Sequence, residues 1–145
     1  MSGTEPGNPQ WEAAEQWFAK AVDDRQVAAL AIAASPALLD PAAYHCQLAI
    51  EKLMKGLLLT CAAAVPRTHD LEHLASLLAP RYPALGAQLS LLAKLSPWGT
   101  ITRYPTPERG IGPSAAEIVQ AIEQIDALIE GIQSLRHQPR QSQDH

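Results

Sequence analysis

Apolar residues recur along the chain mostly at intervals of three and four positions, the spacing of one face of an α-helix. In the first segment these residues are Trp11, Ala14, Phe18 and Ala21. The pattern predicts a helix from about Pro9 to about Asp23. An alanine-rich piece, 25–34, continues the helical spacing until a Ser-Pro pair stops it, and the acidic residues Asp23 and Asp24 allow a bend between the two pieces.

The longest apolar pattern begins at Asp40-Pro41 and predicts a helix that runs to about Ala64, before Pro66. Its core face holds Cys46, Ile50, Leu53, Leu57 and Cys61. Small residues at seven-residue spacing line the opposite side: Ala42, Ala49 and Gly56. Such a stripe lets another helix approach closely, so a second subunit could use it.

Leucines predict two further helices, one from about Asp70 to Pro80 and one from Pro83 to the stop at Ser96-Pro97. Residues 98–113 follow, with three prolines and three glycines, and predict one long loop. Loops of this length inside compact domains often carry function.

The last helix starts with Ser114 and Glu117, which are spaced as a capping box, and extends to about Arg136. Its apolar seam consists of Ile118, Ile122, Ile125, Ile129 and Ile132. The apolar content of the chain is mostly Ala, Leu and Ile, while only 5% of residues are aromatic. These features predict an all-α fold.

The length of 145 residues suits one domain, which we place at 9–137 between disordered segments at 1–8 and 138–145. A formal net charge of −4 gives no general attraction for nucleic acid. No stretch is apolar for long enough to span a membrane, so we expect a soluble, cytoplasmic protein. The two cysteines, Cys46 and Cys61, are roughly 22 Å apart along one helix. They are too distant to pair and are expected to be packing residues.

Polar side chains interrupt the longest helix. Tyr44, Glu51 and Lys55 fall on one stripe between the core face and solvent. Glu51 and Lys55 are four residues apart in the favourable order, which predicts a surface ion pair. His45 and Lys52 project from another side.

The strings "YHCQLAIEKLMKGLLL" (44–59), "THDLEHL" (68–74) and "TRYP" (102–105), before a last amphipathic helix, resemble the HEPN domain family. The resemblance covers about residues 11–135. It implies an up-and-down bundle of four to five helices that commonly forms a homodimer.

The resemblance also implies two kinds of function. Many HEPN domains are metal-independent ribonucleases with an Arg-x4–6-His motif, whereas others bind nucleotides or accompany a minimal nucleotidyltransferase in toxin–antitoxin-like pairs. Here Arg103 has no histidine after it before His137, so the motif is missing where the family has it. A formal Arg-x5-His spacing exists at Arg67 and His73, and these are the candidate catalytic pair.

His69 and His73 have the spacing of two helical metal ligands, but Asp70 between them suits a helix N-cap and no third ligand is evident, so neither a metal nor another cofactor is predicted. Arginine forks match phosphate geometry and tyrosine offers a stacking face. The candidate ligand-binding residues are therefore Tyr44, His45, Glu51, Lys52, Lys55, Arg103, Tyr104 and Arg109. The alternative is that Tyr104 packs the loop onto the bundle and Arg103 pairs with a carboxylate such as Glu51.

The sequence thus favours a HEPN-like, homodimeric, non-catalytic module that binds a nucleotide or a partner, such as a minimal nucleotidyltransferase. Two alternatives stay open. One is a ribonuclease toxin that acts on RNA through Arg67 and His73 or another pair. The other is a purely structural dimerisation module. No membrane contact is expected.

Overall fold

The computed structural model describes residues 9–101 and 112–137, and every regular element in that part of the chain is helical. The elements are α1 (Pro9–Ala33), α2 (Leu39–Thr60), α3 (Leu71–Leu78), a 3-10 turn η1 (Pro83–Leu85), α4 (Gly86–Ala93), α5 (Trp98–Ile101) and α6 (Ala115–His137). The predicted all-α class is confirmed. The described part holds six α-helices, consistent with the predicted bundle, and one of them is the single-turn helix α5 inside the predicted loop.

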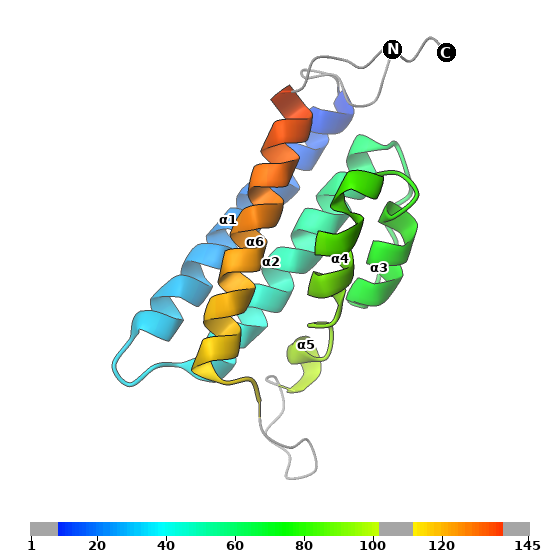
Figure 1. Cartoon of the computed structure of the whole chain (residues 1–145). Helices are drawn as coiled ribbons and strands as arrows, with labels where there is room; N and C mark the ends of the chain where they lie inside the picture. Colours follow the sequence, from blue (N-terminus) through cyan, green and yellow to red (C-terminus); the bar gives the residue numbers. More distant parts are fainter. Residues whose placement is uncertain (1–8, 102–111, 138–145) are drawn as a thin grey trace.

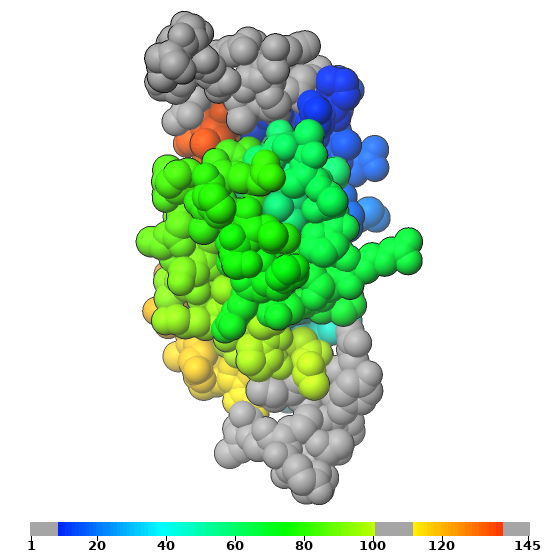
Figure 2. Space-filling view, turned by 90° about the vertical axis from the view of Figure 1, so that its right-hand side faces the viewer, coloured from blue at the N-terminus to red at the C-terminus, as the bar shows by residue number. Residues whose placement is uncertain are grey.

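The long helices α1, α2 and α6 lie side by side along the bundle, and α2 is central (Figure 1). The shorter helices α3 and α4 pack against each other; α3 contacts α2 and α4 contacts α6, and Figure 2 shows the outer side of this layer. The chain runs up and down between these elements, so the start of α1 and the end of α6 lie at the same end of the bundle (Figure 1).

Helix α1 is continuous from Pro9 to Ala33, so the two helical pieces form one helix and the bend that the sequence allowed at Asp23 and Asp24 does not divide it. Within this continuous helix, the side chain of Asp24 is turned away from solvent. Its carboxylate is buried against α2, where it has two cationic or polar partners described below. A buried, paired aspartate is compatible with an uninterrupted helix, whereas the sequence alone suggested a break.

The stripe of small residues on α2 is buried within the chain itself: Ala42, Ala49 and Gly56. Helix α1 packs along α2 over the most extensive interface in the bundle. A Cβ on Gly56 would lie 2.4 Å from Cε1 of Phe18, so the glycine makes room for that ring. The close-packing helix is therefore α1, and at Gly56 the expectation of a second subunit is wrong.

Helix α2 ends at Thr60 rather than at about Ala64, because Ala62 adopts a left-handed φ of 55° that is incompatible with continued α-helix. The Thr60 hydroxyl donates to the Leu57 carbonyl at 2.6 Å and shares a 2.5 Å hydrogen bond with the Tyr82 hydroxyl. The side chain of Tyr82 thus fastens the turn before η1 to the end of α2.

The predicted caps of the later helices are confirmed. The Asp70 carboxylate accepts from the backbone N–H groups of Glu72 and His73 at the start of α3. At the start of α6, the Ser114 N–H donates to Glu117 Oε1 at 2.9 Å and the Glu117 N–H donates to Ser114 Oγ at 3.2 Å. This is the reciprocal pattern of a capping box.

Two ion pairs join α6 to α1. Arg25 binds Asp126 with two parallel hydrogen bonds of 2.8 Å, and Asp126 raises the pKa of the guanidinium above its ordinary value. Arg136 pairs with Glu15 near the other end of the interface.

Both cysteines are free, as predicted: Cys46 is buried in the core and Cys61 lies at the end of α2.

Candidate functional site

The first polar assembly lies between α1 and α2 and is called here the Asp24 group: Asp24, His45 and Lys52. Asp24 Oδ1 is 2.9 Å from His45 Nδ1, and Oδ2 is 2.5 Å from Lys52 Nζ. The aspartate is buried, whereas the histidine and the lysine are half-buried. The ring of Tyr44 meets His45 edge to face, with centroids 5.6 Å apart.

The second assembly lies between α2 and the segment before α3, and is called the Glu51 group: Glu51, Lys55 and His69. His69 Nδ1 is 2.9 and 3.1 Å from the two carboxylate oxygens of Glu51, and Lys55 Nζ donates to Oε2 at 3.0 Å. The side chains of Glu51 and Lys55 are only 7% and 9% exposed, so the prediction of a surface ion pair is wrong.

Neighbouring residues explain this burial. Lys55 Nζ lies 5.9 Å from the ring centroid of Trp17 on α1, in a cation–π contact. On the other side, the Gln47 amide donates to the His69 carbonyl at 3.3 Å and is 3.4 Å from Glu51. The buried carboxylate therefore has charged and polar partners, as a buried ion requires.

The two groups share one arrangement: a buried carboxylate holds the Nδ1 atom of a histidine and the Nζ atom of a lysine. Because a carboxylate only accepts, each Nδ1 carries the proton of its hydrogen bond. The other ring nitrogen, Nε2, then accepts from a hydroxyl when the ring is neutral and donates to an anion when the ring is charged. His69 is 78% exposed, so its Nε2 is open to a ligand.

A small cleft of about 290 Å³ adjoins the Glu51 group. It is called the His69 cleft and is lined by Gln47, Leu48, His69, Asp70, Ser96, Gly99 and Thr100. A Cβ on Gly99 would lie 3.1 Å from the Gln47 amide, so this glycine allows the α5 backbone to approach α2. The walls of the cleft mix polar and apolar surface, and the carboxylate of Asp70 lines it beside the His69 imidazole.

The structure thus divides the predicted ligand-binding residues of α2 into two groups and adds two residues that the sequence interpretation left out, Asp24 and His69. His69 was examined there only as a metal ligand. Arg103, Tyr104 and Arg109 lie outside the described residues, so their predicted role stays a prediction. The alternative partner of Arg103, Glu51, already binds Lys55 and His69.

The candidate catalytic pair is not assembled in the described part of the chain. Arg67 and His73 are both exposed, and no hydrogen bond or ion pair joins them within residues 9–101 and 112–137. Over the same residues no cluster of three or more His, Cys, Asp or Glu side chains is placed to hold a metal ion. His69 is turned to Glu51, and the Asp70 carboxylate is used as a helix cap.

The described residues form an all-helical bundle with polar side chains buried on its central helix, and the family comparison assigns its class. The family model of the HEPN domain matches residues 14–135. The chain belongs to the HEPN domain family. Neither the curated proteins nor the solved structures gave a match. None of the helices described here is both long and apolar enough to cross a membrane.

Proposed function

We propose that this HEPN-domain protein is a non-catalytic nucleotide-binding module that acts with a partner, of which a minimal nucleotidyltransferase is the proposed example. The observation that carries the proposal is the pair of carboxylate-held imidazoles, His45 and His69, with their lysines on α2. A nucleotide offers hydroxyl groups, phosphate oxygens and a base, and these match Nε2 atoms, an ammonium and an aromatic face.

The His69 cleft is the proposed entry point, because its imidazole is exposed and fixed by Glu51. A side chain already held in place loses little conformational freedom on binding. The sequence adds Arg103 and Tyr104 three and four residues after Thr100, which lines the cleft. Both residues lie outside the described part of the chain, and we propose them as the source of a phosphate fork and a stacking face for the bound nucleotide.

Isothermal titration with ATP, GTP, AMP and inorganic phosphate tests the proposal. We expect saturable binding of at least one nucleotide, weakened about tenfold by His69→Ala, since a hydrogen bond to a charged group contributes about 1.5–3 kcal/mol. His73→Ala is the matched control, because this exposed histidine lies in α3, four residues after His69, and does not line the cleft. Equal affinity of both variants and wild type would remove the cleft from the proposal.

A homodimer is part of the proposal. Apolar side chains are exposed at the end of α1, where Leu30 is 63% exposed and Val27 lies one turn before it. The Leu38 N–H donates to the Ala31 carbonyl at 2.9 Å, which brings the exposed Leu38 back to the same end of the helix. An exposed apolar patch of this kind suits a protein partner, and we propose a second copy.

RNA cleavage is the second candidate function, and one observation favours it. An exposed imidazole oriented by a buried carboxylate, as in Glu51 and His69, is the arrangement of a general base. Incubation of wild type, His69→Ala and Arg67→Ala/His73→Ala with RNA in chelator tests it. Cleavage that only one variant loses would identify the base and replace the non-catalytic proposal; no cleavage by wild type would leave nucleotide binding as the function to test.

A further inference from the structure

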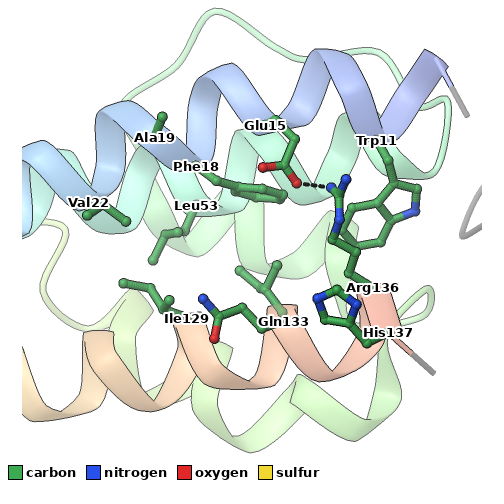
Figure 3. A pocket seen from close by; sticks show the side chains of 11 residues that line it. Trp11, Glu15, Phe18, Ala19, Val22, Leu53, Ile129, Gln133, Arg136 and His137 are labelled. Atoms are coloured by element: carbon green, nitrogen blue, oxygen red, sulfur yellow. Dashed lines mark hydrogen bonds and ion pairs between the residues drawn. The ribbon is translucent and has the colours of Figure 1, made fainter. Parts of the chain in front are cut away.

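A groove of about 600 Å³ separates α1 from α6 at the end of the bundle where α1 begins (Figure 3). Phe18 and Val22 of α1 form one wall, Ile129 and Gln133 of α6 form the other, and Leu53 of α2 lies at the floor. Its size is that of a small-molecule site, and none of its residues belongs to the Asp24 group or the Glu51 group.

Core residues lie at the bottom of the groove. Leu53 lines it although only 1% of that residue is exposed, and Phe18 and Ile132 are likewise buried residues of the core. An α-helix with its side chains is about 10 Å across and needs exposed apolar surface to dock on. Val22 is the only large apolar side chain named on these walls that is strongly exposed, at 45%, so the walls suit a slender apolar body such as an alkyl chain better than a helix.

One end of the groove is charged. Arg136 of α6 pairs with Glu15 of α1 across the opening, and its guanidinium carbon lies 5.8 Å from the ring centroid of Trp11 (Figure 3). His137 lines the same end. Glu15 is exposed, and an exposed ion pair contributes little to stability, so an external anion can compete for the guanidinium, which also has the Trp11 ring as a contact.

We propose that this groove binds a small amphiphilic anion with a slender apolar body and one terminal carboxylate. The apolar body lies along Phe18, Leu53 and Ile129, where it replaces water on apolar walls. The carboxylate binds the Arg136 fork in place of Glu15, which returns to solvent. The site is distinct from the proposed nucleotide site and does not depend on it.

Titration of the full chain with sodium decanoate tests the proposal, with decyltrimethylammonium as a probe of the same chain length and opposite charge. We expect saturable binding of decanoate and weaker binding of the cation. Arg136→Gln should weaken decanoate about tenfold, and Glu15→Gln should tighten it severalfold because the guanidinium loses its internal competitor. Opposite or absent effects of these two variants would overturn the assignment of the anionic end.

A steric pair of variants tests the groove itself. Ala19→Leu adds volume at a lining position and should abolish decanoate binding, whereas Ala13→Leu makes the same change at an exposed position of α1 outside the groove. Circular dichroism establishes that both variants are folded. Retained binding by Ala19→Leu, or no saturable binding by wild type, would overturn the proposal. A dimer lost only in Ala19→Leu would assign the groove to a second copy instead.

Discussion

The ring of Phe18 fills the place that a side chain on Gly56 would take, with Cε1 only 2.4 Å from the position of a Cβ. We therefore expect Gly56→Ala to destabilise the protein. Overpacking costs about 1–3 kcal/mol and the better helix propensity of alanine returns about 1 kcal/mol, so the net loss should be about 1 kcal/mol in urea unfolding. Gly86→Ala is the control, because nothing lies within 4 Å of its Cβ. A Gly56→Ala variant as stable as wild type would show that the ring moves freely into the groove.

Removal of the buried lysine should be costly. Lys55→Met leaves the carboxylate of Glu51 buried with the His69 imidazole and the Gln47 amide but no lysine, and we expect a loss of about 3 kcal/mol in the free energy of unfolding. The double variant Glu51→Gln/Lys55→Met should regain part of it, since no unpaired charge is then buried. Lys20→Met, at an exposed position of α1, should change stability by less than about 0.5 kcal/mol. A small effect of Lys55→Met would contradict the buried ion pair.

Stability should fall in alkaline solution. Burial raises the pKa of the Cys46 thiol from its ordinary 9.0 to about 12, and burial likewise raises the pKa of Tyr82. Below about pH 9 the thiol is protonated in both states, so its contribution is fully present; above it, only the unfolded chain loses the proton, which favours unfolding progressively toward pH 12. Urea unfolding at about pH 8 and about pH 10 measures the loss, which should be smaller in Cys46→Ala.

The same burial predicts thiol reactivity. The thiolate is the reactive form, so Cys46 should resist modification at neutral pH, whereas Cys61 at the end of α2 is partly exposed. Labelling of the native protein with a thiol reagent, followed by mass spectrometry of the peptides, should find modification at Cys61 alone. In denaturant both cysteines should react, and equal labelling of both in the native state would contradict the closed core around Cys46.

The proposed homodimer predicts a specific effect of charge at Leu30. Leu30→Lys should shift the protein to monomer in sedimentation analysis, because an apolar interface does not tolerate an unpaired ammonium. Leu77→Lys is the matched control, since Leu77 is an exposed leucine on α3, in a different part of the bundle. A dimer that survives Leu30→Lys would place the interface elsewhere.

Most of the fold was predictable because helix starts and stops have local causes. Asp70, Ser114 and Glu117 signal their caps within four residues, and these predictions are confirmed. The end of α2 was less predictable, since the left-handed φ of Ala62 has no signal in a run of alanines. The partners of Asp24 in the middle of α1 are the distant residues His45 and Lys52, which no local pattern reveals.

The candidate site was predictable only in part. The sequence identified Glu51 and Lys55 as a pair four residues apart, but that spacing is the same for a surface pair and a buried one. Burial is decided by Trp17 and His69, which approach from other segments of the chain. The groove beside Trp11 and Arg136 gave no sequence signal, because its two walls are more than 100 residues apart.

The interface between α1 and α2 also bears on the order of folding. These helices are neighbours in the sequence, so their contacts close a short loop, whereas the Arg25–Asp126 pair joins residues 101 positions apart. We expect the α1–α2 hairpin to form early and α6 to dock last. The groove between α1 and α6 then exists only after this final step, so a molecule bound there would hold the last helix in place and slow the unfolding of the whole bundle.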